Sequence, residues 1–498
     1  MEKTAARRRT NKTAGLSARA SSQTAHVSNP RTVPSPTAAQ DAATDRLIAR
    51  ARDRRTVVLE RLRAESPATG LLVAAAPEAI RSADTHHPYR QDSDFLALTG
   101  FDEPEAVALV LPHQKDHPYV LYVRPRDPER EAWDGARAGV DGARTRYEAN
   151  FSASIAQMEN TIGPYLEGLE RLYYAFGKDV AMDARVSKLL AWLRQTRNRR
   201  GTGVITVVDP TDLLHEMRLR KSTDEIATMR RAAEITVQGH EAGMAVARPG
   251  AYEYEVLAEI EYTFRKLGSP SWGYPTIVGS GPNATTLHYR EATRAMQDGE
   301  LVLVDAGAEF EFYTADVTRT YPVNGRFSKA QRELYEIVLA AQDAGIAAAR
   351  VGRAFSDVHT EATRVLIEGL IDVGLLVGTV DDNRAQQTYT RYYMHQTSHW
   401  LGMDVHDVGR YRLLAGDAVE ARRLEAGMVL TVEPGLYIRE GVEPPKGVSP
   451  EILEKYSGIG IRIEDDVVVT DGEPDVLTGA LVKRADEVER CLRGRRAG

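Results

Sequence analysis

The sequence predicts an α+β protein with two domains, the second of which is built from two similar halves. Its 498 residues are more than one ordinary hydrophobic core holds, so a division into domains is expected. In residues 44–208 strand-like runs alternate with helices, which is typical of a small α/β domain. In residues 221–485 a helix pair, a histidine phrase and two acid-bearing strands occur twice in the same order. Such a repeat can place a functional site on the pseudo-twofold axis between its halves.

Residues 1–43 differ in composition from the rest of the chain. The first 41 positions hold seven lysines and arginines against two acids, with few large apolar residues. Such a segment buries too little apolar surface to offset the entropy of ordering, so we expect a disordered basic tail. An Arg-rich, acid-poor start is also typical of a transit peptide, but no amphipathic apolar face is present, which favours a solvated tail. We further expect a linker at 209–220 and a second tail at 486–498.

The N-terminal domain should contain a long helix, a set of strands and a further helix. Ile48, Val58 and Leu62 belong to an apolar pattern that predicts an Arg-rich helix over 44–65. Short apolar runs predict the strands. The expected strands are 70–75, 106–111, 119–123 and 171–176, and the expected second helix is 181–194.

Two capping boxes mark the starts of the helix pairs in the C-terminal domain. Ser222 precedes Glu225 by three residues, and Ser328 precedes Gln331 by the same interval, so each serine can cap a helix. The first helix should end before Pro249. The other expected helices are 252–267, 328–350 and 357–373.

Carboxylates and histidines occupy matching places in the two halves. In each half a glycine-led apolar strand delivers one carboxylate six residues on, and a second strand carries another inward carboxylate. A histidine phrase precedes each pair. The carboxylates are Asp305, Asp316, Glu433 and Glu464, and the histidines are His288 and His399.

Asp305, Asp316, His399, Glu433 and Glu464 form an oxygen-dominated ligand set. Such a set suits Mn²⁺ better than a zinc ion selected by thiolates. One divalent cation would leave four carboxylates with a net negative charge, whereas two would neutralise them. Two-metal sites can activate water for hydrolysis. The sequence therefore predicts two divalent metal ions, with Mn²⁺ as the best match.

Arg462 and Glu464 are two residues apart on an expected strand, so their side chains should share a face. We expect the guanidinium to hold this carboxylate ionised and oriented.

Each of these residues alone has a simpler interpretation. An aspartate at the end of a strand is usually a turn or cap residue, and Glu433 precedes Pro434-Gly435. His395 and His399 are four residues apart and could share a helix face without touching metal. The joint occurrence of all five residues within a repeated frame favours the metal site.

Composition excludes other classes of function. The formal net charge of −7 argues against a general nucleic-acid binder, and no apolar run approaches the roughly 18 residues that span a bilayer. The single cysteine, Cys491, excludes an intramolecular disulfide and a thiolate-rich zinc site. We expect a cytoplasmic protein that binds neither nucleic acid nor membranes.

Beyond the repeat, several phrases of the chain are distinctive. They are Leu287-His288-Tyr289, Val304-Asp305-Ala306-Gly307, Ala315-Asp316-Val317-Thr318-Arg319-Thr320, Ser398-His399-Trp400-Leu401-Gly402, Asp404-Val405-His406-Asp407-Val408-Gly409, Thr431-Val432-Glu433-Pro434-Gly435 and Gly460-Ile461-Arg462-Ile463-Glu464-Asp465. These phrases resemble those of the aminopeptidase P (Xaa-Pro aminopeptidase) family, which belongs to the pita-bread metallopeptidases. The similarity spans roughly residues 60–485 and includes residues 90–106 of the N-terminal domain.

The resemblance implies a C-terminal pita-bread fold and a dinuclear site. Asp316 and Glu464 would bridge the two ions, Asp305 would complete one of them, and His399 and Glu433 the other. A bridging water or hydroxide would attack the scissile carbonyl, with Glu433 as the proton acceptor.

The resemblance also implies roles around the ions. His288 and His406 would stabilise the tetrahedral intermediate and handle the leaving proline nitrogen. Tyr274, His395 and Arg462 match positions that line the pocket for the proline ring.

The implied activity is hydrolysis of the bond between an N-terminal residue and a proline at position two, by a homodimer or homotetramer. A prolidase restricted to Xaa-Pro dipeptides is the nearest alternative, and residues 90–106 favour the aminopeptidase. A catalytically inactive binding scaffold is a further alternative, against which the complete ligand set argues.

Overall fold

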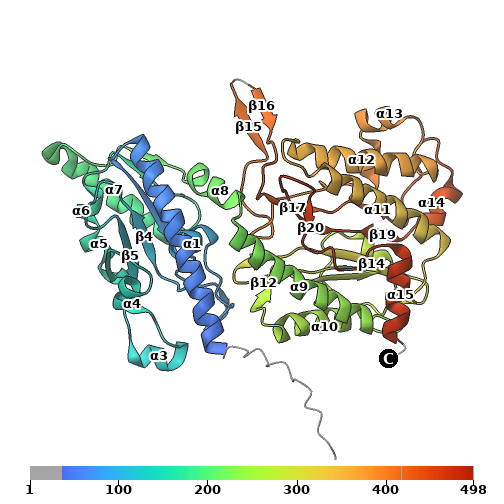
Figure 1. Ribbon diagram of the computed structural model, residues 1–498, viewed down its shortest axis with the longest axis horizontal. Coiled ribbons are helices and arrows are strands. Elements are labelled where there is room, and N and C mark those ends of the chain that lie inside the picture. Colours follow the sequence, from blue (N-terminus) through green and yellow to red (C-terminus); the bar gives the residue numbers. More distant parts are fainter. Residues whose placement is uncertain (1–35, 417, 497–498) are drawn as a thin grey trace, which may run out of the picture. The chain divides into compact units, whose positions relative to one another are not determined.

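The structure is a computed structural model that describes residues 36–416 and 418–496 (Figure 1). The chain divides into a short unit, Met1–Ala43, and one compact unit, Thr44–Gly498. Helix α1 (Pro36–Glu65) begins inside the predicted basic tail, so residues 36–43 are helical rather than disordered; residues 1–35 lie outside the described residues. Within the described ranges, no helix combines the length and apolar character needed to cross a membrane.

The N-terminal domain is built on a six-stranded mixed sheet in the order β6-β5-β4-β1-β7-β8. Alternate side chains of a strand point to opposite faces, and helices cover both faces. Leu71 of β1 belongs to the core that includes Val58 of α1, whereas Leu72 belongs to the core that includes Val186 of α7 (Val180–Arg200). The strands are β1 (Thr69–Ala74), β4 (Val107–Val110), β5 (Tyr119–Val123), β6 (Phe151–Ser154), β7 (Arg171–Tyr173) and β8 (Thr206–Val208).

Shorter elements connect these strands. They are β2 (Ile80–Ser82), β3 (Thr85–His86), α2 (Ser93–Thr99), α3 (Pro128–Asp134), α4 (Gly139–Thr145), α5 (Met158–Thr161) and α6 (Gly163–Leu166). The predicted strands and helices of this domain are all present, with ends that shift by up to eight residues.

Each half of the C-terminal domain begins with a pair of packed helices. Both predicted capping boxes are present, because the hydroxyls of Ser222 and Ser328 each accept from the backbone N–H three residues on, at 3.3 Å. Close packing needs glycine in the first pair, since a Cβ on Gly239 would lie 2.3 Å from the ring of Phe264. The pairs are α9 (Thr223–Val246) with α10 (Glu253–Lys266) and α11 (Lys329–Ala348) with α12 (Phe355–Asp372).

The helix pairs back several small sheets, which meet between the two halves. Glu464 N–H donates to Thr318 C=O at 3.1 Å, and Thr320 Oγ1 donates to Arg462 C=O at 3.0 Å. The first half contains the sheets β10-β11-β14 and β13-β12-β9, and the second contains β17-β20-β21 and β18-β19. This duplicated arrangement is the pita-bread fold expected from the sequence.

The bounds of these strands place the site residues at their ends. In the first half they are β9 (Ser271–Trp272), β10 (Ile277–Ser280), β11 (Leu301–Asp305), β12 (Ala308–Phe310), β13 (Tyr313–Thr314) and β14 (Thr318–Pro322). In the second half they are β17 (Val429–Val432), β18 (Gly435–Ile438), β19 (Ile459–Arg462), β20 (Asp465–Val468) and β21 (Asp475–Val476), with the short helices α13 (Val380–Ala385) and α14 (Pro450–Tyr456).

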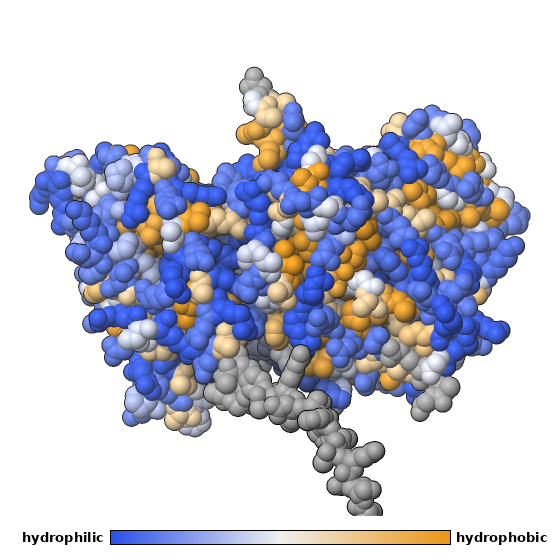
Figure 2. Space-filling model, in the orientation of Figure 1, coloured by the Kyte–Doolittle hydropathy of each residue, from blue (hydrophilic) through white to orange (hydrophobic). Residues whose placement is uncertain are grey.

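A hairpin of β15 (Arg412–Ala415) and β16 (Ala418–Ala421) projects from the second half (Figure 1). It exposes Leu413, Leu414 and Val419, and Figure 2 shows this apolar surface next to largely hydrophilic neighbours.

Two segments differ from the organisation expected of them. The predicted linker at 209–220 forms helix α8 (Thr211–Leu219), which buries Leu214 in the core of the N-terminal domain. The described part of the predicted C-terminal tail forms helix α15 (Ala485–Arg496), which buries Leu492 in the core around α9 and α10. The partners of both helices lie far away in the sequence, so the local sequence does not identify them.

Candidate metal centre and active site

A cavity of about 960 Å³ lies where the strands of the two halves of the C-terminal domain meet. Every residue that the sequence singled out for the site lines this cavity. These residues are Tyr274, His288, Asp305, Asp316, His395, His399, His406, Glu433, Arg462 and Glu464.

All four carboxylates lie where the chain passes from one sheet to another. Asp305 ends β11, Asp316 lies between β13 and β14, Glu433 between β17 and β18, and Glu464 between β19 and β20. The sequence predicted Asp316 and Glu464 within strands, which was wrong in that detail. Because the backbone bends at a strand break that switches sheets, side chains of both halves can converge on one cavity.

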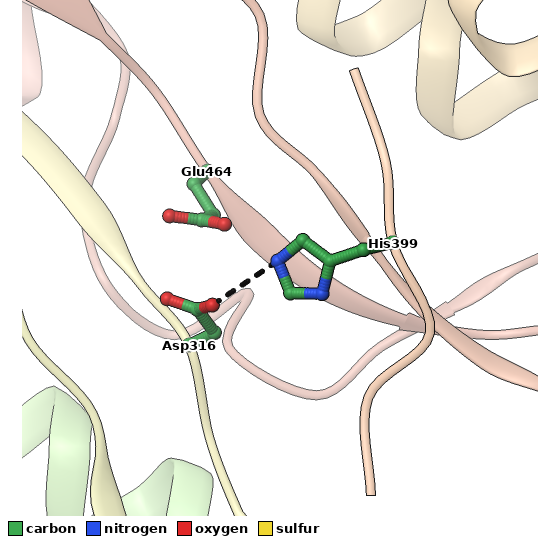
Figure 3. Close-up of side chains that lie close together, drawn as sticks. All are labelled: Asp316, His399 and Glu464. Carbon is green, nitrogen blue, oxygen red and sulfur yellow. Dashed lines mark ion pairs between the residues drawn. The ribbon is translucent and has the colours of Figure 1, made fainter. Parts of the chain in front are cut away.

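Three of the expected metal ligands lie close together. Asp316, His399 and Glu464 each offer one ligand atom, and these atoms lie within 4.8 Å of one another (Figure 3). His399 Nε2 is 3.4 Å from Asp316 Oδ2 and 3.7 Å from Glu433 Oε1. His399 Nδ1 donates to Trp400 C=O at 3.0 Å, which directs Nε2 toward the carboxylates.

Asp305 and Glu464 are oriented by a chain of buried donors. Arg462 Nη2 donates to Asp305 Oδ2 at 2.5 Å, and the Tyr274 hydroxyl donates to Asp305 Oδ1. Arg462 orients Glu464 through one intervening hydroxyl. Arg462 Nε donates to Thr318 Oγ1 at 3.0 Å, and that hydroxyl donates to Glu464 Oε2 at 2.6 Å. The strand break after Arg462 explains why the link is indirect, because the alternation of side chains does not continue across it.

A buried ion-pair network fixes the backbone behind Glu464. Arg319 Nη2 lies 2.7 Å from Asp465 Oδ1, and Lys483 Nζ lies 2.7 Å from Asp465 Oδ2. Arg319 Nη1 also donates to the Glu464 carbonyl at 2.5 Å. Burial opposes ionisation, yet Arg319 and Lys483 hold the pKa of Asp465 well below its usual range. The network therefore stays charged and holds the strand break in place.

The crowded carboxylates need compensating positive charge. Burial and repulsion by Asp316 raise the pKa of Glu464 well above its usual value, and burial raises the pKa of Glu433 to about 7 although His399 opposes this. Burial lowers the pKa of His399, but the hydrogen bond to Asp316 and the charges of Glu433 and Asp316 together outweigh burial and raise the pKa to about 9. The cluster thus binds protons readily, and divalent cations would compete for the same atoms. By its chemistry the donor set fits metal ions.

His288 and His406 are the exposed histidines of the cavity. The ring of His406 lies 4.4 Å from the ring of His399 in an edge-on arrangement. Burial lowers the pKa of His406, so its imidazole is neutral at pH 7. A neutral imidazole at this position can exchange a proton or a hydrogen bond with a molecule in the cavity.

His395 is fixed by its neighbours rather than free to bind a polar group. Its Nδ1 donates to Gln396 C=O at 2.8 Å, and its Nε2 lies 2.8 Å from the Tyr437 hydroxyl, which also accepts from Arg462 Nη1 at 2.9 Å. Burial lowers the pKa of His395 to about 3. The ring is therefore neutral, with both nitrogens engaged.

Three supporting residues were not singled out from the sequence. Thr318 was within reach of such an inference, because it lies two residues after Asp316 in a strand pattern. His359 accepts from Thr397 N–H at 3.2 Å, and Thr397 C=O accepts from Glu433 N–H at 2.8 Å, so His359 supports the segment beside Glu433. Nothing in the local sequence marks His359 or Tyr437, since their partners lie 38 and 42 residues away.

The duplicated fold and the cavity between its halves define a pita-bread metallohydrolase. The profile of metallopeptidase family M24 matches residues 227–471, and that of the aminopeptidase P N-terminal domain matches residues 51–173.

Similarity to individual proteins extends over nearly the whole chain. The Xaa-Pro aminopeptidase of Escherichia coli is 42% identical over 88% of this chain and 96% of its own length, and human Xaa-Pro aminopeptidase 3 is 31% identical over 84% and 80%. The solved structure of Pseudomonas aeruginosa aminopeptidase PepP has a TM-score of 0.85 at 43% identity, covering 91% of this chain and 99% of that one. A zinc-substituted Escherichia coli aminopeptidase P in complex with product has a TM-score of 0.84 at 42% identity, covering 90% and 99%. The chain belongs to the aminopeptidase P family of the M24 metallopeptidases. The family resemblance, the fold and the enzyme class expected from the sequence are thereby confirmed.

Proposed function

We propose that this protein is a metal-dependent aminopeptidase that removes the first residue from peptides whose second residue is proline. The observation that carries the proposal is the convergence of all five expected ligands and the two exposed histidines, His288 and His406, on one cavity. The curated relatives, named as Xaa-Pro aminopeptidases, support the same activity.

Asp305, Asp316, His399, Glu433 and Glu464 would hold two divalent metal ions. Arg462 adds one buried positive charge to the cavity that the four carboxylates line, so one divalent cation would leave the group negative, whereas two would not. The predominance of oxygen donors favours Mn²⁺. When bound, such ions polarise the scissile carbonyl and lower the pKa of a water molecule.

Proton transfer is the role that we propose for Glu433. Its side chain is 16% exposed, compared with 7% for Asp316, and this greater exposure supports a position on the substrate side of the cluster. We assign to Glu433 the acceptance of a proton from the attacking water and its transfer to the leaving nitrogen. His288 and His406 at the rim would hydrogen-bond the developing oxyanion and the leaving group.

Specificity for proline requires recognition by shape. The bond before proline has no N–H for an enzyme to hold, so a general peptidase loses its usual contact. Tyr274, His395 and Arg462 would line the proline pocket. Because both His395 nitrogens are engaged, this side chain would offer a ring surface to the apolar pyrrolidine rather than a free donor.

The test is a comparison of peptides with the Mn²⁺-loaded protein. An Xaa-Pro-Xaa tripeptide and longer Xaa-Pro peptides should release their first residue, and a matched peptide with alanine in place of proline should be a much poorer substrate. Asp316→Asn should abolish turnover, whereas Asp298→Asn, which alters an exposed carboxylate away from the cavity lining, should not. Cleavage of Xaa-Pro dipeptides alone would indicate a prolidase, and no cleavage with metal bound would indicate an inactive scaffold.

We also propose Mn²⁺ as the physiological ion, a cytoplasmic location and a homodimeric or homotetrameric state. The ligand chemistry supports the first of these proposals. For the domains, we propose an N-terminal domain over 44–208 and a catalytic domain from 221 that continues through α15, because Leu492 of this helix packs in the catalytic core.

A further inference from the structure

The cavity wall beside His406 is formed by a short irregular segment, residues 403–407. Val405 and His406 of this segment line the cavity. Within the C-terminal domain, Asp407 N–H donates to Trp400 C=O at 2.9 Å. A segment without regular structure needs further contacts if it is to hold a side chain in a fixed place.

Arg218 of α8 supplies those contacts. Its Nη2 lies 2.7 Å from Asp404 Oδ2 and 2.6 Å from Asp407 Oδ1, so one guanidinium holds both acids that flank Val405 and His406. Its Nη1 lies 2.7 Å from Asp94 Oδ1. The Arg218 side chain is 4% exposed, so its contacts with the buried Asp94 and Asp407 are shielded from water, whereas Asp404 is 43% exposed.

The N-terminal domain reaches the same segment through two further hydrogen bonds. Ser93 Oγ donates to Asp404 Oδ1 at 2.7 Å, and Arg90 Nη2 donates to Met403 C=O at 2.9 Å. Asp94, the third carboxylate on Arg218, follows Ser93 in helix α2. The three residues 90, 93 and 94 thus connect one face of the N-terminal domain to the segment that carries His406.

Asp407 is buried as an ion between two cations. Lys221 Nζ lies 2.9 Å from Asp407 Oδ2, and both of these side chains are 1% exposed. Although burial opposes it, Lys221 and Arg218 lower the pKa of Asp407 below its usual value. Loss of one cation would leave a partly uncompensated charge in the interior, so the segment would move to reach water.

We propose that Arg218 is a positioning residue for catalysis, which fixes the 403–407 segment so that His406 stays against the cavity at its spacing from His399. This inference rests on the proposed function, because it assigns the effect of Arg218 to His406. It also gives the N-terminal domain a role in the chemistry, since Asp94 and Ser93 hold the far side of the same network. Displacement of a catalytic group by about 1 Å can cost on the order of 100-fold in rate.

The main experiment is a double-mutant cycle between Arg218→Met and His406→Ala, measured as kcat/KM for an Xaa-Pro-Xaa tripeptide with Mn²⁺ bound. If Arg218 acts through His406, Arg218→Met lowers kcat/KM strongly in the wild-type background and changes it by less than about 2-fold in the His406→Ala background. Arg218→Lys keeps the charge and should restore part of the loss. Independent, multiplying losses from the two substitutions would overturn the proposal.

Arg50→Met is the matched control. Arg50 is also a buried arginine, 8% exposed, and its Nη2 pairs with Asp224 of α9 at 2.6 Å. Its hydrogen bonds within the described part of the chain go to Asp224 and Thr228 of α9 and not to the 403–407 segment. Its loss should leave kcat/KM within about 2-fold of wild type. An equal loss of activity in Arg50→Met would mean that Arg218 acts through general stability, and the proposal would fall.

Hydrogen exchange provides a test that does not depend on activity. The amide of Asp407 is protected by its hydrogen bond to Trp400 C=O. It should exchange faster in Arg218→Met than in the wild type, and at the wild-type rate in Arg50→Met. If Arg218→Met does not fold, Asp404→Asn removes one carboxylate from the network and should show the same local effect more weakly. Unchanged exchange at residues 403–407 in Arg218→Met would refute the proposed role of Arg218, whatever the activity of the protein. Failure of the wild-type protein to cleave any Xaa-Pro peptide would count against the proposed function.

Discussion

Replacing Thr318 with valine tests how the chain prepares Glu464 to bind metal. The Thr318 hydroxyl donates to Glu464 Oε2 at 2.6 Å and accepts from Arg462 Nε at 3.0 Å. The side chain is completely buried on β14, and valine has nearly the same shape. The substitution therefore removes two hydrogen bonds to charged groups and leaves the packing largely intact.

A hydrogen bond to a charged group contributes about 1.5–3 kcal/mol, which corresponds to roughly 10- to 150-fold in an equilibrium constant. Loss of a group that orients a metal ligand commonly weakens metal binding by about 10- to 100-fold. We predict that Thr318→Val weakens Mn²⁺ binding within that range and lowers kcat/KM at limiting Mn²⁺ by a similar factor. Competition with a fluorescent chelator measures the first quantity, and tripeptide hydrolysis measures the second.

Thr320→Val is the matched control, because Thr320 is buried on the same strand and its hydroxyl bonds only the backbone of Arg462, at 3.0 and 3.2 Å. It should change the free energy of unfolding more than it changes Mn²⁺ affinity. Equal Mn²⁺ affinities for Thr318→Val and wild type would refute the assigned role of this hydroxyl, as would an equal loss of affinity in the control.

Three further predictions concern stability. Chelation of the metal should lower Tm, and added Mn²⁺ should restore it. The free energy of unfolding should rise by about 3 kcal/mol when the free ion is near 100 times its Kd, and Asp316→Asn should show no such response. Burial lowers the pKa of His240 to about 4, so the folded state does not take up the proton that the unfolded chain binds below about pH 6.5. The free energy of unfolding should therefore fall by about 2 kcal/mol between pH 7.5 and pH 5. Urea titrations of His240→Gln should lack this part of the pH dependence. Asp465→Asn should cost about 3–5 kcal/mol, because it leaves Arg319 and Lys483 buried without their partner, whereas Asp343→Asn, which breaks an exposed pair, should cost less than about 1 kcal/mol by the same denaturation measurement.

The sequence predicted which residues belong to the site better than it predicted their hydrogen-bond partners. The two capping boxes and the glycine-led strands are local patterns, so the helix starts at Ser222 and Ser328 and the position of Asp305 could be predicted from short windows. The repeat then suggested that Asp305 and Glu433 meet, which the cavity bears out.

The orientation of those residues could not be predicted in the same way. The pairing of Arg462 with Asp305 joins residues 157 positions apart, and it depends on how β14 and β19 align across the two halves. Strand alternation assigned Arg462 to Glu464 instead, because a break of two residues between strands leaves no clear mark in a run of apolar and charged residues. The contacts of Arg218 are equally non-local, since Asp404 and Asp407 lie 186 and 189 residues further along the chain.

The most direct test of the central claim is the number and position of metal ions in crystals of the Mn²⁺-loaded protein, located by anomalous scattering. The account predicts two peaks per chain, both within coordination distance of residues from the set Asp305, Asp316, His399, Glu433 and Glu464. A single peak, or peaks that do not involve Asp316 and Glu464 together, would contradict it.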